Sequence, residues 1–385
     1  MTEWREQKLS DFMDFNPYTP LSKGIIAKKV TMEKLIPFNR KIQGYEDAVF
    51  SGGAKFKNGD TLVARITPCL KNGKTAYVDF LDDEEVAFGS TEFIVLRAKE
   101  GISDSRFIFY FAISDEFRDT AIQLRSGTTR QRVDTEALKR KVFMLPPLPE
   151  QKAIAEVLSS LDDKIDLLHR ENKTLEAMAE TLFRQWFIEE AEDDWEEVSL
   201  KDIYTFEKGF EPGSDSYLKE KSEDAIRFIR VKDLPEDTAS IYIRKNIAEK
   251  ICTADDLLMS FDGTPGRLNF GLEGAYSSGI RKIYSTNPLY NNLGLKYLIF
   301  KSKSIQDTIK AYSDGTVIIH AGSSIDNLVF SFPDENKIAE FNNLIDPIFT
   351  KIQLNKVQIR TLTQLRDTLL PKLMSGEVRV DLCQS

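Results

Sequence analysis

Side chains that donate hydrogen bonds to anions and to base edges are concentrated in three stretches of the sequence. Residues 21–74 hold 11 Lys/Arg and 4 Asp/Glu, and residues 264–303 hold 6 Lys/Arg and 1 Asp/Glu. The segment Gly127–Arg132, with the sequence GTTRQR, adds compact donors beside a glycine. Lys and Arg neutralise phosphates, and Arg and Gln also pair with the edges of guanine and adenine. These residue types predict contact with a nucleic acid, although any one of them alone is as often part of a surface ion pair or a helix cap.

We predict two sets of nucleic-acid contacts, without dividing them between bases and phosphates. In the first half of the chain they are Lys28, Lys29, Arg65, Lys71, Lys74, Thr129, Arg130, Gln131 and Arg132. In the second half they are Arg227, Arg230, Lys232, Thr264, Arg267, Arg281, Lys282 and His320.

The sequence lacks the usual motifs of catalysis and metal binding. It has two histidines, His169 and His320, and its three cysteines lie far apart, so neither a Ser/His/Asp site nor a zinc site is expected. Gly73–Thr75 resembles the end of a phosphate-binding loop, but Pro68 stands where the first glycine of that loop belongs. Phe15–Tyr18 carries only part of the Asn-Pro-Pro-Tyr motif of amino-methyltransferases. We therefore predict that this chain has no catalytic residue, no metal site and no bound cofactor.

The negative charge of the chain is unevenly distributed. The net charge is −9, but residues 150–197 alone hold 15 Asp/Glu and 5 Lys/Arg, so the remainder is about neutral. A polyanion responds to the potential within a Debye length, ~8–10 Å, so basic clusters outside the acidic segment remain candidates. No apolar run approaches the ~20 residues of a membrane span, and the first residues do not resemble a signal peptide. The sparse, odd cysteine count is typical of the reducing cytoplasm, where we expect the protein.

The chain consists of two diverged copies of one unit. Glu3–Asp11 matches Asp194–Asp202 at an offset of 191 residues, and Lys164–Ile165 matches Lys351–Ile352 at an offset of 187. Each copy begins with a turn-rich segment of short β-type runs, continues through a proline-containing junction and ends in a long helical pattern. A repeat of this length predicts two similar domains.

Apolar residues in both helical segments recur at alternating spacings of four and three, which is the pattern of a coiled-coil seam. The predicted seam residues are Ile154, Leu158, Leu161, Ile165, Leu168, Leu175, Leu182, Phe341, Ile345, Ile348, Ile352, Ile359, Leu362 and Leu369. Each stripe also includes one asparagine, Asn172 or Asn355, of the kind that fixes register. The alternative interpretation is two amphipathic helices that lie on separate cores. We favour pairing, because both stripes are narrow.

Prolines and glycines set the expected limits of these helices. A helix over residues 150–187 would span roughly 57 Å at ~1.5 Å per residue, which suits a spacer. Pro347 should kink the second helix or restart it near Asp346, and Pro371 should end it shortly before Gly376. Because a long mixed segment separates the two helices in the chain, they are able to pair antiparallel.

We predict an α+β fold in which two similar mixed α/β domains are separated by two long helices that form an antiparallel coiled coil, with a pseudo-twofold internal repeat. The expected boundaries are 1–148 for the first domain, 149–190 for the first spacer helix, 191–333 for the second domain, 334–376 for the second spacer helix and 377–385 for a tail.

This order of domains and helices resembles that of the specificity subunits of Type I restriction–modification systems, over essentially the whole chain. Pro147–Ala155 is similar to the entry of the family's first spacer helix, and Leu365–Glu377 is similar to the end of its C-terminal helix. Arg65–Lys74, Gly89–Phe93 and Ser260–Arg267 resemble signatures of its target-recognition domains.

The resemblance implies that each mixed domain recognises one half of a bipartite double-stranded DNA target and that the helices set the spacing. It also implies two modification subunits that use S-adenosylmethionine, motor-nuclease subunits that use ATP and Mg²⁺, and no catalysis by this chain itself. The alternatives from other classes are a scaffold whose two copies bind proteins or ligands, and a fused restriction enzyme that acts alone.

Overall fold

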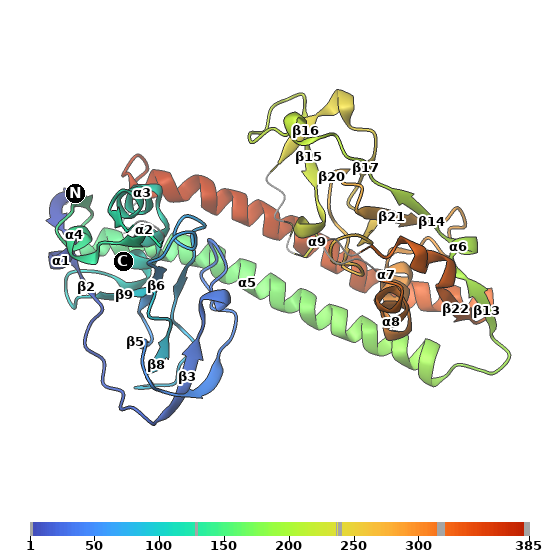
Figure 1. The fold of residues 1–385 in the computed structure, drawn as a ribbon, viewed down its shortest axis with the longest axis horizontal. Coiled ribbons are helices and arrows are strands. Elements are labelled where there is room, and N and C mark those ends of the chain that lie inside the picture. The colour runs from blue at the N-terminus through green and yellow to red at the C-terminus, as the bar shows by residue number, and fades with distance from the viewer. Residues whose placement is uncertain (1–2, 128–129, 236, 238–240, 314–319, 381–385) are drawn as a thin grey trace. The chain divides into compact units, whose positions relative to one another are not determined.

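The computed structural model describes residues 3–127, 130–235, 237, 241–313 and 320–380. The chain folds into two compact units, one of residues Met1–Asp166 with Thr361–Ser385 and one of residues Leu167–Arg360. Two long helices, α5 (Leu148–Arg184) and α9 (Glu335–Met374), contribute to both units (Figure 1). A π-helical turn, Gln185–Glu189, extends α5.

The first unit is built on two four-stranded sheets. One has the strand order β2-β9-β6-β7 and is antiparallel, and the other has the order β4-β3-β8-β5, in which β3 and β8 are parallel. Their strands are β2 (Met13–Phe15), β3 (Ile26–Val30), β4 (Glu46–Val49), β5 (Ala54–Phe56), β6 (Thr61–Ala64), β7 (Thr75–Tyr77), β8 (Ala87–Gly89) and β9 (Phe93–Ala98). Two ribbons are added, which pair β1 (Arg5–Lys8) with β12 (Val142–Leu145) and β10 (Arg125–Ser126) with β11 (Arg132–Val133).

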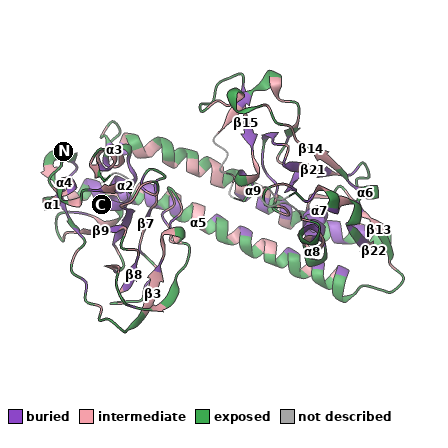
Figure 2. Ribbon diagram, viewed as in Figure 1, coloured by how far each residue is buried: buried purple, intermediate pink, exposed green. Residues whose placement is uncertain are grey.

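Helix α2 forms the centre of the first unit's core. Asp104 caps its first turn by accepting a hydrogen bond from the Phe107 amide at 2.9 Å, and every residue from Phe107 to Ile113 is buried. A helix that is apolar on all sides must be enclosed, and β6, β9 and the two long helices supply that enclosure (Figure 2). The short helices of this unit are α1 (Leu9–Phe12), α2 (Ser105–Ile113), α3 (Asp115–Gln123), α4 (Thr135–Lys139) and a 3₁₀ turn at Met32–Lys34.

The second unit repeats the two four-stranded sheets and the β1–β12 ribbon of this plan. Its sheets have the orders β14-β21-β18-β19 and β16-β15-β20-β17, and β15 and β20 are the parallel pair. The strands are β14 (Thr205–Lys208), β15 (Ala225–Ile229), β16 (Tyr242–Arg244), β17 (Ile251–Cys252), β18 (Leu257–Ser260), β19 (Leu268–Asn269), β20 (Gly274–Tyr276) and β21 (Ile280–Tyr284), with a ribbon of β13 (Glu196–Ser199) and β22 (Val329–Phe332). The helices are α6 (Leu200–Ile203), α7 (Leu293–Lys301) and α8 (Lys303–Ala311), with 3₁₀ turns at Ser214–Ser216, Val231–Asp233, Lys245–Ile247 and Gly322–Asn327.

The matching strand orders confirm the internal repeat. The first strands, β1 and β13, begin 191 residues apart, and the two long helices begin 187 residues apart. These are the offsets that the sequence matches indicate. The repeat is therefore one of topology as well as of sequence, and the α+β fold class is confirmed.

The long helices pair antiparallel in both units. In the first unit, Arg366 Nη1 near the end of α9 donates to Asp162 Oδ1 in the first half of α5 at 2.8 Å. In the second unit, Asn355 Nδ2 donates to Asn172 Oδ1 at 2.8 Å. Later residues of α9 thus meet earlier residues of α5. The same helices also join each unit's core, through residues such as Ile154 and Phe341.

The expectations that α9 restarts near Asp346 and that it ends at Pro371 are wrong. The helix runs without interruption through Pro347 and passes Pro371 before it ends at Met374, where Gly376 adopts a positive φ of 73°. Proline removes one backbone donor and crowds the carbonyl four residues earlier. Pro347 is exposed, so water can hydrate the carbonyl that loses its partner, while the buried neighbours Ile345 and Phe349 hold the helix on the core.

Candidate nucleic-acid interface

Three segments converge at one place in the first unit, and we call their described residues the first loop cluster: 65–67, 90–92, and 126–127 with 130–132. The Arg65 amide donates to the Glu92 carbonyl at 2.8 Å, and the Thr67 amide donates to the Gln131 carbonyl at 3.0 Å. An isolated antiparallel bridge joins Ile66 to Arg132. The backbone therefore brings together segments that lie far apart in the sequence.

Arg132 and Glu92 form a forked ion pair in this cluster. Nε and Nη2 of Arg132 both donate to the Glu92 carboxylate, and Nε lies 2.9 Å from each of its oxygens. The hydrogen bond from Arg132, assisted by the charges of Arg65 and Arg130, lowers the pKa of Glu92 below its usual value. Arg130 is exposed, and the Arg65 Nε donates to the Val133 carbonyl at 3.2 Å. Four of the predicted contacts, Arg65, Arg130, Gln131 and Arg132, therefore meet here.

The lysines predicted in the first half do not join this cluster. Lys28 and Lys29 lie on β3, where they form ion pairs with Glu85 and Glu46, each at 2.7 Å. Lys74 Nζ donates to the Met32 carbonyl at 2.9 Å, so it ties two loops together. Lys71 is exposed, and Thr129 falls outside the described residues. For the three partnered lysines the structure shows an internal ion pair or hydrogen bond.

The second unit has an equivalent arrangement, the second loop cluster, formed by residues 261–267, 277–279 and 320. An antiparallel bridge joins Asp262 to His320, and His320 Nδ1 lies 2.7 Å from Asp262 Oδ1. Arg281 lies beside this pair, and its Nη1 donates to the Ser278 carbonyl at 2.8 Å. Burial lowers the pKa of Arg281, and the charge of Asp262 opposes that shift. Thr264 and Arg267 are exposed on the same turn.

Four other predicted contacts of the second half lie outside this cluster. Arg227 forms an ion pair with Asp237, and Arg230 forms one with Asp233 at 3.4 Å in a helix cap. Lys282 on β21 contacts Glu207 at 3.4 Å, and Lys232 is exposed.

Two carboxylates were absent from the sequence-based prediction. Glu92 and Asp262 were overlooked because acidic side chains repel phosphates, and a search for DNA contacts favours cations. The available signal was their position inside two segments already singled out, Gly89–Phe93 and Ser260–Arg267. That these acids lie beside Arg132 and His320 depends on tertiary contacts, which sequence spacing alone does not reveal.

The predicted seam residues all lie on buried or half-buried positions of α5 and α9. Ile154, Leu158, Leu168, Phe341, Ile345 and Ile352 are buried, and Leu161, Ile165, Leu175, Leu182, Ile348, Ile359, Leu362 and Leu369 are half-buried. Two polar contacts interrupt the apolar seam. One is the Asn172–Asn355 pair, and the other joins Arg366 to Asp162, whose second oxygen accepts the Tyr110 hydroxyl at 2.7 Å.

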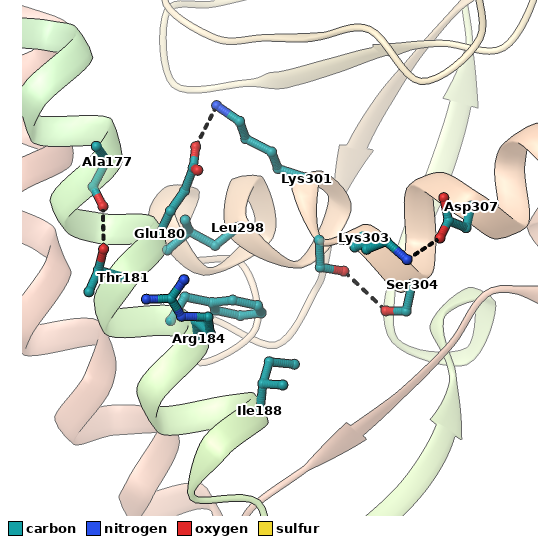
Figure 3. A pocket seen from close by; sticks show the side chains of 12 residues that line it. Ala177, Glu180, Thr181, Arg184, Ile188, Leu298, Lys301, Lys303, Ser304 and Asp307 are labelled. Carbon is teal, nitrogen blue, oxygen red and sulfur yellow. Dashed lines mark hydrogen bonds and ion pairs between the residues drawn. The ribbon is translucent and has the colours of Figure 1, made fainter.

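A groove of about 680 Å³ lies in the second unit, between the end of α5 and helices α7 and α8 (Figure 3). Leu298 and Ile188 supply apolar surface, and Ile188 is 55% exposed. The Lys301–Glu180 ion pair, with an N–O distance of 2.7 Å, borders the groove. This surface combines an apolar floor with fixed charges.

Neither a metal-ligand cluster nor a helix suited to cross a membrane occurs in the part of the chain that the structure describes. Cys69 and Cys252 are free thiols, and burial raises the pKa of Cys252 to about 12. A thiol held in this protonated state is a poor nucleophile.

Comparison with known proteins shows what this chain is similar to. The model of the Type I restriction modification DNA specificity domain matches residues 1–177. The specificity subunit of the Type I restriction enzyme HindI from Haemophilus influenzae is 24% identical, over 98% of this chain and 100% of that protein. The chain is thus similar to specificity subunits of Type I restriction enzymes. A second relative, the MjaIX specificity subunit of Methanocaldococcus jannaschii, is 27% identical over 74% of this chain and 71% of its own length.

One solved structure has a similar fold. The crystal structure of the Type I system S subunit from M. genitalium aligns over 98% of this chain and 96% of its own, with a TM-score of 0.56 and 19% identity. At that identity the likeness concerns the fold alone.

Proposed function

We propose that this chain selects the DNA target of a Type I restriction–modification complex and that residues 1–148 and 191–333 are its two target-recognition domains. Each domain would recognise one half of a bipartite target. The observation that carries the proposal is that both repeats build the same loop cluster, with cationic or imidazole donors held beside a carboxylate. Two equivalent surfaces of this kind are what a protein needs in order to recognise two half-sites.

We place the spacing function in residues 149–190 and 334–376. Helix α5 has 37 residues and is therefore roughly 56 Å long at ~1.5 Å per residue. Major-groove sites one turn apart are separated by ~34–36 Å, so paired helices of this length are able to space two half-sites. The continuity of α9 through Pro347 supports its role as a rigid spacer.

In this proposal the chain itself performs no chemistry. Two modification subunits would methylate adenines with S-adenosylmethionine, and motor-nuclease subunits would use ATP and Mg²⁺. The acidic 150–197 segment would carry partner contacts, since it is a poor surface for DNA. Such a complex would work in the cytoplasm, where the target DNA and both cosubstrates are found.

Purified protein distinguishes the functions. We expect the chain alone to bind DNA weakly and with strong salt dependence, and to confer sequence-specific methylation once modification subunits are added. A scaffold would bind no DNA even in that complex, and a fused enzyme would cleave DNA alone with a divalent metal. Either result would exclude the proposal.

The groove beside Ile188 is our proposed contact for a modification subunit, because an exposed apolar floor with a charged border suits a protein partner. The change Ile188→Asp should weaken assembly by about tenfold or more, since it buries a charge in the interface. Val49→Asp, a change of a similarly exposed residue on β4, is the matched control. Size-exclusion chromatography of the mixed subunits measures the effect, and equal assembly of both variants would exclude this contact.

A further inference from the structure

The two repeats place one polar residue at the same structural position in each loop cluster. Arg132 bridges Ile66, which follows the end of β6 by two residues, and His320 bridges Asp262, which follows the end of β18 by two residues. Arg132 and His320 are therefore counterparts, although one is a guanidinium and the other an imidazole. Each is partly exposed to solvent, Arg132 at 41% and His320 at 63% of its side chain.

Each counterpart contacts a carboxylate, but the two carboxylates come from different sequence positions. In the first unit the acid is Glu92, which immediately precedes β9, and Ile66 is apolar. In the second unit the residue that immediately precedes β21 is Gly279, and the acid is Asp262, at the position of Ile66. A β-carbon on Gly279 would lie only 3.3 Å from Cβ of Asp262. The absence of a side chain at Gly279 thus leaves room for Asp262. Between the two units the acid occupies a different sequence position, whereas its partner, Arg132 or His320, occupies the same structural position.

The backbone holds both acids in place. The Glu92 amide donates to Ser90 Oγ at 3.1 Å and its carbonyl accepts the Arg65 amide at 2.8 Å. The Asp262 carbonyl accepts the Thr264 amide at 2.9 Å. A solvent-exposed ion pair contributes only about 0–1 kcal/mol to stability. Stability therefore explains poorly why the same arrangement occurs twice through different residues. Orienting a side chain that contacts a DNA base explains it directly.

The two oriented groups offer different hydrogen-bonding chemistry. Arg132 uses Nε and Nη2 on Glu92, and among the described residues nothing accepts a hydrogen bond from its Nη1, so it presents donors only. Asp262 accepts from His320 Nδ1, which places the ring proton on that nitrogen in the neutral imidazole. Nε2, which has no partner within the described part of the chain, is then an acceptor. In the major groove, guanine offers acceptors and the amino groups of adenine and cytosine offer donors.

We propose that Arg132 and His320 are the counterpart base-reading residues of the two half-sites, that Glu92 and Asp262 are their positioning residues, and that the pairs select different bases. Arg132 selects guanine at one position of the first half-site. His320 selects a base whose amino group lies in the major groove, adenine or cytosine, at one position of the second. This inference rests on the proposed function, because it assumes that the loop clusters face DNA.

The test uses the full chain assembled with its modification subunits and a DNA library with randomised half-sites, in which methylated adenines are mapped by sequencing. For Arg132→Gln we expect the preference for guanine to fall by about tenfold or more at one position of one half-site, with the other half-site unchanged. Lys139→Gln, which removes an equal charge from an exposed ion pair with Glu136 in the same unit, is the matched control and should leave the profile intact.

A uniform loss of methylation across all sequences, with a weaker salt dependence, would identify Arg132 as a phosphate contact and overturn the inference. An unchanged profile would overturn it too. Arg132→Lys, which keeps the charge but loses the fork, should also relax the same position, and thermal melting of each complex shows that the variants are folded. If the wild-type complex itself showed no sequence preference, the proposed function would fail instead.

Two further variants test the pairing. Glu92→Gln should relax the same position as Arg132→Gln, and Glu92→Asp, which keeps the carboxylate, should restore part of the preference. His320→Arg should shift one position of the second half-site toward guanine and leave the first half-site as it is. A Glu92→Gln variant that melts earlier but keeps the wild-type profile would show that the acid is only structural.

Discussion

The ammonium group of Lys356, on α9, is held in the second unit by hydrogen bonds to fixed acceptors. Its Nζ donates to Asn269 Oδ1 and to the Phe270 carbonyl, each at 2.9 Å, and lies 3.8 Å from the centre of the Phe270 ring. Burial lowers the pKa of Lys356 from 10.5 to about 8, and the charge of Glu176 opposes the shift only in part. The helix is thus attached to its unit by a group that is costly to keep charged.

This depressed pKa predicts a pH dependence of stability. Between pH 8 and pH 10.5 the unfolded chain binds a proton that the folded chain does not, so folding becomes more favourable as the pH rises through that window. Relative to Lys356→Met, the wild-type free energy of unfolding should rise by up to about 3 kcal/mol across it. Urea unfolding at a series of pH values measures the difference. Lys303→Met, a change of an exposed lysine, should give no such trend, and parallel curves for wild type and Lys356→Met would contradict the prediction.

Single residues were the level at which sequence was least informative. The donors Arg132 and His320 were foreseeable from residue type, but no local pattern indicated that Lys28 forms an ion pair with Glu85, 57 residues away. Ion pairs of this kind depend on which loops meet, and the meeting is decided by sheet topology. Composition counts therefore overestimate the number of cations that are available to a ligand.

Helix α9 carries a proline in its interior, and its continuity has an energetic consequence. Pro347 leaves the Asn343 carbonyl without a helical partner, and an interior proline costs a helix about 3 kcal/mol relative to alanine. Pro347→Ala should therefore raise the free energy of unfolding by about 1–3 kcal/mol, as judged by urea unfolding. Pro371→Ala, in the last turn, should gain less. A loss of stability in Pro347→Ala would mean that the helix needs the proline's restricted backbone.

The Asn172–Asn355 pair is a polar layer in an apolar seam. The residues equivalent to these two by the 187-residue offset are Ile359 and Leu168, so only one of the two corresponding layers is polar. Such a layer favours one register of paired helices, because any other alignment buries an unsatisfied amide.

A double-mutant cycle tests this layer. Asn355→Leu alone should lower the free energy of unfolding by about 1–3 kcal/mol, because Asn172 is left buried without its donor. The double change Asn172→Leu with Asn355→Leu should recover part of that loss, which gives a coupling energy of about 1 kcal/mol or more. Denaturant unfolding followed by circular dichroism measures it. Additive effects would show that the two amides act separately.

Elements were predicted better than residues because their signals are local. The apolar spacing in α5 was visible over ten turns without knowledge of the fold, and short runs such as Phe93–Leu96 lie in strands as expected. The prolines misled because the rule for an isolated helix omits the packing around Ile345 and Phe349. Tertiary contacts outweigh local propensity where one face of a helix is fully buried.

The whole molecule consists of one plan used twice, and the long helices pass from one unit to the other at two points, after Asp166 and after Arg360. If the helices set the target spacing, seven residues inserted at both points should lengthen the gap between half-sites. Seven residues add about 10.5 Å of helix at ~1.5 Å each, or roughly three base pairs at ~3.4 Å per pair.

Methylation mapping of this insertion variant, assembled with modification subunits, provides the measurement. We expect both half-site sequences to be retained and only their separation to change, because each unit keeps its own contacts. Inserting the seven residues at one point alone should abolish methylation, since the paired helices would differ in length. An unchanged gap in the double insertion would show that the helices do not measure distance.

The exchange of an acid between the positions of Glu92 and Asp262 bears on how such proteins should be compared. In a column-by-column alignment of the two halves, Glu92 stands against Gly279 and Ile66 stands against Asp262. Each acid then looks unmatched in the other half. Compared by spatial contacts, both halves keep one acid beside the counterpart residue, Arg132 or His320, although the acid comes from a different sequence position in each half. Surveys that rank residues by column identity would discard both acids, whereas a comparison of spatial contacts between residues would retain them.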